Sequence, residues 1–146
     1  MIGQLVSHDV RDAIVDAAAA VADIAAGRGP GAKSDIVAGA LVGGPTTVNS
    51  FIAPAAGTIL SAAAALGTGC AAGETVTIDV QIGGVSCLTA PYVINAASGT
   101  GVEQGAVDPA ADDFVAGDLI TVIWTQADAG GPTSADLFHS IGWRLT

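Results

Sequence analysis

Histidine is the side chain that most often carries acid–base chemistry near neutral pH, and this chain contains two, His8 and His139. A Ser-His-Asp site needs a serine hydroxyl beside the imidazole, and Ser140 follows His139 directly. Adjacent residues of a β-strand point to opposite faces, so we expect Ser140 to point away from that imidazole. A histidine in an apolar run is typically a core or interface residue. We therefore predict that His139 is not catalytic and that His8 is solvated.

A cluster of carboxylates occurs in the segment VDPAADDFVAGD, which contains Asp108, Asp112, Asp113 and Asp118. Calcium takes six to eight oxygen ligands, often from a loop of this kind. The residue spacing of an EF-hand is absent, and Asp-Pro is a common start of a turn. We interpret the segment as a solvated loop and keep a calcium site as the less favoured alternative.

The remaining reactive residues do not form a recognisable site. The glycine-rich segment GTGCAAG lacks the lysine and the hydroxyl of a phosphate-binding loop. Cys70 and Cys87 have no metal-ligand spacing, and we expect free thiols in preference to a disulfide between them. The sequence thus predicts no catalytic residue, no metal ligand and no cofactor.

The composition favours a protein that binds another protein. The formal net charge is −10, with 4 Lys+Arg against 14 Asp+Glu, so the chain lacks the cations that nucleic acid or an anionic membrane surface attracts. Only 12% of residues are charged and 51% are hydrophobic, whereas a soluble domain typically has about 25% charged residues. A surface with so few charges favours oligomerisation or docking on a large assembly.

The N-terminal segment differs in pattern from the rest of the chain. Apolar residues recur near helical spacing from residue 8 to about 26, and Gly27 can end a helix there. The segment GRGPGAKS that follows has the glycine and proline content of a linker. We predict an N-terminal arm over residues 1–33, made of a helix and a linker, followed by a β-domain over residues 34–146.

Residues after the linker alternate between apolar and polar, which indicates antiparallel strands with one buried face. In the segment VTIDVQI, Val76, Ile78, Val80 and Ile82 share one face. Gly83-Gly84 then gives a strong signal for a two-residue hairpin. Eight short strands separated by turns predict a mainly β protein, an antiparallel β-sandwich with jelly roll as the leading topology. The predicted strands cover residues 35–42, 46–53, 57–66, 74–83, 86–95, 102–107, 118–127 and 135–145.

Two strands near the C-terminus suggest an interface. The segment DLITVIWTQA is apolar on both of its faces, and strands of this kind are buried on both. One face can meet the sandwich core while the other meets a second subunit. The last strand places Leu137, His139, Ile141, Trp143 and Leu145 on one face.

The β-domain resembles the head decoration, or cement, proteins of tailed bacteriophages. The resemblance is carried by FIAPAAGTI, which opens a strand, by VTIDVQIGGVSCL and by DPAADDFVAGDLITV, and it extends from about Val48 to Leu145. Tail and receptor-binding proteins of phages share motifs of this kind. The resemblance implies a structural protein without enzymatic activity, located on the capsid exterior and assembled in the host cytoplasm.

The resemblance also implies partners and contact residues. It implies a homotrimer at three-fold or quasi-three-fold positions of an icosahedral capsid, which bridges subunits of the major capsid protein. The arm would contact the capsid, and the β surface would form the trimer. The implied capsid contacts are the cations Arg11, Arg28 and Lys33. The residues assigned to trimer contact or core packing are Trp124, His139 and Trp143.

Two other classes of function remain open at this stage. A tail or baseplate receptor-binding module, with carbohydrate as its ligand, would use Trp124, Trp143 and Tyr92 as a stacking platform. Trp143 has apolar neighbours on its strand face, which favours core packing instead. A small hydrolase or an accessory domain of an enzyme is the third class, and the missing acid–base constellation argues against it.

Overall fold

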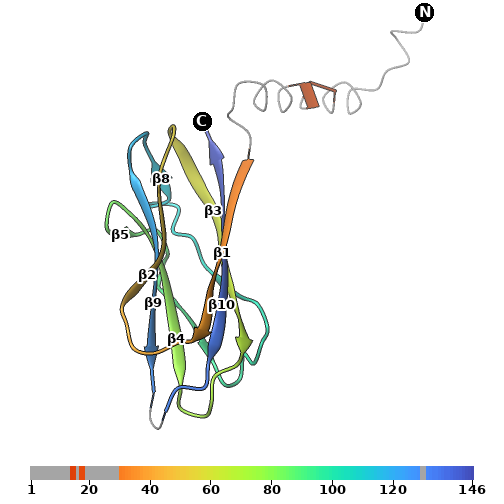
Figure 1. The fold of residues 1–146 in the computed structure, drawn as a ribbon. Coiled ribbons are helices and arrows are strands. Elements are labelled where there is room, and N and C mark those ends of the chain that lie inside the picture. Colours follow the sequence, from red (N-terminus) through yellow and green to blue (C-terminus); the bar gives the residue numbers. More distant parts are fainter. Residues whose placement is uncertain (1–13, 16, 19–29, 129–130) are drawn as a thin grey trace, which may run out of the picture.

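The protein is an antiparallel β-sandwich of two five-stranded sheets. The computed structural model describes residues 14–15, 17–18, 30–128 and 131–146. Sheet A has the order β1-β10-β3-β7, and β8 also pairs with β3. Sheet B has the order β2-β9-β4-β5, and β6 also pairs with β4. The sheets pack face to face, and the chain enters β1 at the end of the sandwich where it leaves β10 (Figure 1).

The strand bounds are as follows. Sheet A contains β1 (Pro30–Ala40), β3 (Gly57–Thr68), β7 (Glu103–Gly105), β8 (Asp113–Phe114) and β10 (Ala135–Leu145). Sheet B contains β2 (Thr46–Ile52), β4 (Thr75–Ile82), β5 (Val85–Ser86), β6 (Tyr92–Asn95) and β9 (Leu119–Ala127). Apart from the very short β5 and β8, the chain changes sheet at every connection except that from β4 to β6. This order is the connectivity of a jelly roll, so the predicted β-sandwich is confirmed.

Three details differ from the strands that the sequence predicted. β1 begins at Pro30 rather than at residue 35, because residues that read as linker pair with β10, starting with Pro30 opposite Arg144. The single strand predicted over 86–95 is two strands, and Pro91 between them has no N–H to give to a ladder. The two-residue strand β8 was not predicted, since two residues show no alternation.

The predicted N-terminal helix lies largely outside the described residues. Residues 14, 15, 17 and 18 are helical, and Ile14 and Val15 are exposed. Among the residues that the structure describes, no helix has the length and apolar character needed to cross a membrane.

The hairpin between β4 and β5 has the backbone that its sequence requires. Gly83 has a φ of 59° and Gly84 a φ of 87°. A tight type I′ turn needs positive φ at both central residues, which glycine adopts without steric cost. The hairpin predicted at Gly83-Gly84 is therefore confirmed.

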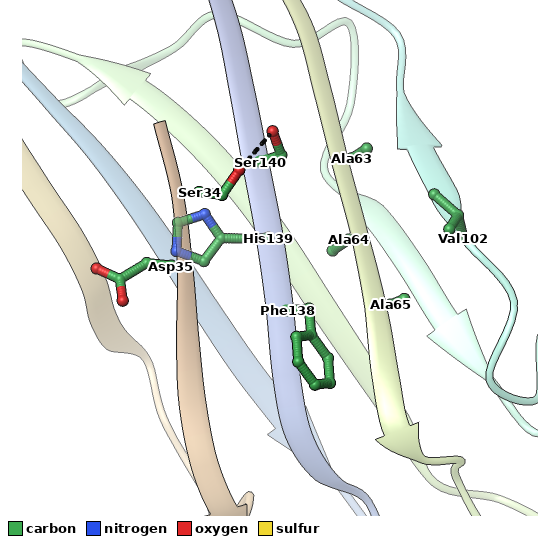
Figure 2. A pocket seen from close by; sticks show the side chains of 9 residues that line it. All are labelled: Ser34, Asp35, Ala63, Ala64, Ala65, Val102, Phe138, His139 and Ser140. Carbon is green, nitrogen blue, oxygen red and sulfur yellow. Dashed lines mark hydrogen bonds between the residues drawn. The ribbon is translucent and has the colours of Figure 1, made fainter. Parts of the chain in front are cut away.

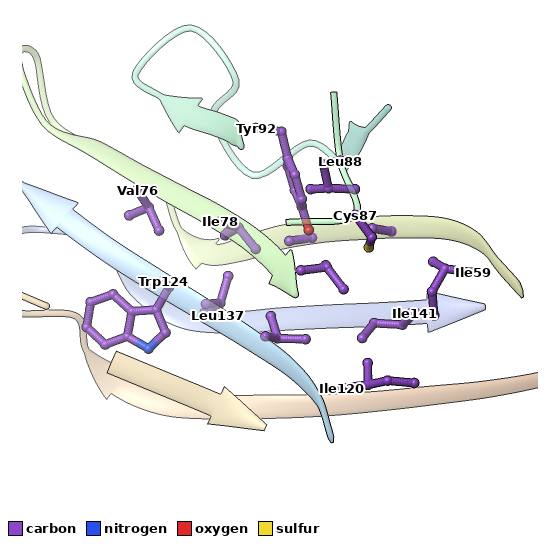
Figure 3. Packing of buried hydrophobic residues seen from close by; sticks show 14 of the residues in the cluster. Ile59, Val76, Ile78, Cys87, Leu88, Tyr92, Ile120, Trp124, Leu137 and Ile141 are labelled. Carbon is purple, nitrogen blue, oxygen red and sulfur yellow. The ribbon is translucent and has the colours of Figure 1, made fainter. Parts of the chain in front are cut away.

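The core lies between the two sheets and follows the alternation of the sequence (Figure 3). Val76, Ile78 and Val80 of β4 are at most 1% exposed. They meet Ile120 of β9 and Ile141 of β10 within one cluster. Each fully buried side chain of this size contributes about 1.5–3 kcal/mol to the free energy of unfolding. The outward face of β9 is less covered, with Leu119 47% exposed in the single chain.

Candidate functional site

His139 faces the core and has no catalytic partner among the described residues. Its side chain is 3% exposed, and neither ring nitrogen has a hydrogen-bond partner. Burial lowers its pKa; Asp35 raises the pKa and Lys33 lowers it further. The Ser140 side chain lies on the other face of β10, where its hydroxyl accepts a 3.1 Å hydrogen bond from the hydroxyl of Ser34 (Figure 2). The described part of the chain therefore brings no serine to this imidazole.

The carboxylates of the acidic segment serve local turns. Asp108 accepts a 2.9 Å hydrogen bond from the N–H of Ala110, and Asp118 accepts one of 2.8 Å from the N–H of Val115. Asp113 accepts the hydroxyl of Thr58 on the neighbouring strand at 2.7 Å. Within the described ranges, no group of three or more His, Cys, Asp or Glu side chains is arranged to hold a metal ion.

Among the described residues, Glu74 is the side chain with the most hydrogen bonds, and no pattern in the sequence singled it out. It is 1% exposed and lies just before β4. Its carboxylate accepts the backbone N–H groups of Ala71, Thr133 and Ser134 at 2.9–3.2 Å. The hydroxyls of Thr133 and Ser134 also donate to it, as does the amide of Gln126. Within the part of the chain that the structure describes, no cation pairs with the buried Glu74 carboxylate. Its negative charge is stabilised by hydrogen bonds from neutral N–H and O–H groups.

These bonds set the charge state of Glu74 and join the loops at one end of the sandwich. Burial alone would raise the pKa of the carboxyl, but hydrogen bonds from Ser134, Ala71 and Thr133 lower it from 4.5 to about 2. Gln126 extends the network, since its side-chain oxygen accepts the N–H of Gly43 at 3.1 Å. The loops after β1, β3 and β9 are thus tied together, which is a structural role rather than a catalytic one.

Both cysteines are free thiols, as the sequence favoured. Cys87 belongs to the buried core, and burial raises its thiol pKa to about 11. Burial also raises the pKa of Cys70, whose thiol donates to the carbonyl of Ile94 at 3.6 Å. Thiols with raised pKa values are poor nucleophiles at neutral pH, so neither cysteine is a candidate for covalent catalysis.

The aromatic side chains are turned inward and do not form a sugar platform. Trp124 is 5% exposed and Tyr92 is 9% exposed, both within the core cluster. Trp143 is half-buried, with its ring centroid 5.1 Å from that of Phe51. Phe138, in contrast, is exposed, at 46%.

The cations proposed for capsid contact fall in different parts of the molecule. Arg11 and Arg28 lie outside the described residues. Lys33 lies in β1, where its ammonium is 5.7 Å from the ring centroid of Phe51, a cation–π contact within the chain. Arg144, the fourth cation, is exposed at the end of β10.

The outer face of sheet A is the clearest candidate for an interaction surface. It carries a shallow hollow of about 230 Å³ with a floor that includes Ala63 and Ala65 and with Phe138 and Val102 at its margins (Figure 2). Val102 is 66% exposed, and Ile36 beside Phe138 is 48% exposed. An exposed patch of apolar and small side chains marks a contact with another protein more often than a reaction site.

The molecule is thus a small antiparallel β-sandwich whose described residues assemble no catalytic group. No family model matches the sequence, and no curated protein matches it. A chain from the capsid of Ralstonia phage GP4 has a similar structure, with a TM-score of 0.52 and 18% sequence identity. The match covers 80% of this chain and 84% of that chain, so the two share a fold.

Two further solved structures match with lower scores. A chain of the cyanophage Pam1 capsid asymmetric unit has a TM-score of 0.45 and 13% identity, over 80% of this chain and 84% of that chain. The crystal structure of FLHE has a TM-score of 0.45 and 16% identity, over 80% of this chain and 98% of that chain.

Proposed function

We propose that the protein is a structural component of a phage particle, which decorates an icosahedral capsid and stabilises it by bridging major capsid subunits. The observation that carries this proposal is the fold shared with a chain from the capsid of Ralstonia phage GP4. The decoration-protein resemblance of the strand motifs between Val48 and Leu145 supports the same class. We place the protein on the exterior of the virion, after assembly in the host cytoplasm.

The chemistry of the surface supports binding over catalysis. His139 is buried without a partner, and the carboxylates of the acidic segment are engaged in separate turns. The exposed apolar groups on sheet A and on the outer face of β9 offer contact area instead. A net charge of −10 disfavours nucleic acid as the ligand.

The proposed arrangement gives the two parts of the chain different partners. The arm predicted over residues 1–33 reaches the capsid, with Arg11 and Arg28 before β1 and Lys33 within the first residues of β1 as its cations. The outward face of β9, with Leu119 and Ile123, forms the contact within a trimer. A trimer that touches three capsid subunits gains avidity which one weak contact lacks.

Stabilisation of the particle then follows from linkage. A protein that binds only the assembled, expanded shell stabilises that state in proportion to its differential affinity for it. The test is a comparison of particles with and without the protein under heat and osmotic shock. We expect particles without it to assemble but to lose DNA at a lower temperature. Equal resistance of the two kinds of particle, with loss of attachment to cells, would instead establish a receptor-binding protein.

A further inference from the structure

We propose that the outer face of sheet A pairs two copies of this chain about a two-fold axis that passes over Ser140. Directly paired residues of antiparallel strands point to the same side of a sheet, so the outward residues form rows across β1, β10 and β3. The central row is Ser34, Ser140 and Ala63. The row on one side is Ile36, Phe138 and Ala65. The row on the other side is Ala32, Gly142 and Ser61.

The two outer rows differ in size in a way that fits self-association. Ile36 and Phe138 project from the face, at 48% and 46% exposure. Gly142 has no side chain, and a Cβ there would lie only 2.6 Å from the hydroxyl of Ser61. The proposed two-fold axis lies in the plane between the two facing sheets and runs perpendicular to the strands. It places each strand opposite the same strand of the second copy, in the reverse direction. Residues equally far from Ser140 then meet, so Phe138 faces Gly142 and Ile36 faces Ala32.

Charge follows the same symmetry. Asp136 and Arg144 lie four residues on either side of Ser140, and alternation places Arg144 on the face of Ser140. Asp136 has a φ of 56° beside a β-bulge, so alternation does not place it. Its Cβ lies next to Gly67 together with the ring of Phe138, which puts the Asp136 side chain on the same face. The two-fold operation therefore brings Arg144 of one copy toward Asp136 of the other, twice in each pair. Arg144 is exposed and forms no ion pair with the described residues. Asp136 uses one carboxylate oxygen to accept the N–H of Gly39 at 2.7 Å, and its second oxygen is not needed for that bond.

A contact between these two residues can arise only between copies. Eight residues of a strand span about 26 Å, so Arg144 and Asp136 of one chain are far beyond hydrogen-bond reach. Facing sheets align within about 30° of each other, and the long arginine side chain can bridge the lateral offset that this angle produces.

A second copy suits this face better than other partners do. Two chains of net charge −10 repel each other, and the two contacts of Arg144 with Asp136 offset part of this repulsion. Asp113, in the row of Thr58 and Arg144, adds a further carboxylate to the face. The three long strands β1, β10 and β3 have 11, 11 and 12 residues, whereas β7 has three, so the footprint is roughly 35 by 14 Å, or about 500 Å². A standard interface buries about 800 Å² on each partner, so a face of this size fits a weak, dissociable pair. The pairing is independent of a trimer contact through β9, because that strand belongs to the other sheet.

The test is a charge swap followed by light scattering of the full-length protein. We expect wild type to contain an even number of chains at high micromolar concentration. Arg144→Asp places like charges together twice and should weaken the pairing at least about tenfold. Adding Asp136→Arg to that variant should restore the pairing. Should that double variant fold poorly, Asp136→Asn retains an oxygen for Gly39 and should give partial rescue.

A cross-linking experiment locates the axis without relying on charge. Ser140→Cys in a Cys70→Ser background should form a covalent dimer with a bis-maleimide that spans about 10 Å, the usual distance between facing sheets. The matched control is Val85→Cys, which is 67% exposed on β5 at the edge of sheet B, away from β9, and should not cross-link. A wild-type monomer or trimer, an unchanged mass in Arg144→Asp, or equal cross-linking at position 85 would each overturn the pairing. Capsid binding is measured separately, so failure here leaves the proposed function standing.

Discussion

The Glu74 carboxylate accepts both the backbone N–H and the hydroxyl of Ser134, a residue 60 positions later in the chain. This pair joins the start of β4 to the loop that precedes β10, and hence sheet B to sheet A. The bonds are charge-assisted, which makes them roughly twice as strong as bonds between neutral groups. The network therefore fixes one end of the sandwich.

Replacement of Glu74 by Gln should destabilise the fold although the side chain keeps its size. The amide presents donors to the N–H groups of Thr133 and Ser134, and buried donors without an acceptor cost about 1–3 kcal/mol each. We expect a loss of about 2–4 kcal/mol in the free energy of unfolding, measured in urea. Glu103→Gln on the short strand β7 is the matched control and should change it by less than about 0.5 kcal/mol. Equal stability of the two variants would contradict the role of Glu74.

Acid should destabilise the protein in two steps. The pKa of Glu74 is lowered from 4.5 to about 2, so the stability from its charged form is present above pH 4.5 and is lost between pH 4.5 and about 2. The pKa of His139 lies below 6.5 because of burial, so the unfolded chain takes up a proton first as the pH falls below 6.5. Denaturation curves at a series of pH values should show the free energy of unfolding falling in both pH ranges, once below pH 6.5 and again between pH 4.5 and about 2. Glu74→Gln should remove only the lower one.

Replacement of His139 by Leu should stabilise the protein near pH 6. The buried imidazole has two ring nitrogens without a hydrogen-bond partner, and a polar group in that state costs about 1–3 kcal/mol. An apolar residue of similar size removes this cost and also the upper slope of the pH profile. Loss of stability with the slope intact would show that His139 has a partner after all.

The two tryptophans should contribute differently to stability. Trp124 is 5% exposed within the core, and Trp124→Ala should cost about 3–5 kcal/mol as a large-to-small core change. Trp143 is half-buried against Phe51, so Trp143→Ala should cost less, about 1–3 kcal/mol. Thermal unfolding of both variants beside wild type measures the difference. A larger loss for Trp143 would contradict the packing described above.

Removal of residues 1–29 should leave the sandwich folded, because β1 begins at Pro30 and the core cluster contains residues from Leu41 onward. We expect an unfolding temperature close to that of wild type and weaker binding to capsids. Replacement of Arg11 and Arg28 by Ala should reproduce the binding loss with folding intact. Unfolding of the truncated protein would show that the segment belongs to the sandwich.

Much of the sandwich could be predicted from alternation, which reports local burial. The faces of β4 and β10 and the turn at Gly83-Gly84 follow directly from residue order. The role of Glu74 could not be predicted, since its partners are up to 60 residues away and no local pattern encodes them. The same holds for the rows on sheet A, which depend on the register between β1, β10 and β3. The early start of β1 was hidden because glycine and proline signal a linker more often than an edge strand.

The central claim is that this protein binds a phage shell from outside and stabilises it. The most direct measurement is the binding of purified protein to expanded capsids that lack it, by cosedimentation and by the temperature at which the particles release DNA. We predict saturable binding to expanded capsids, none to unexpanded ones, and a rise in the release temperature on binding. Absence of binding to expanded capsids from the same phage, with a protein shown to be folded, would contradict the claim.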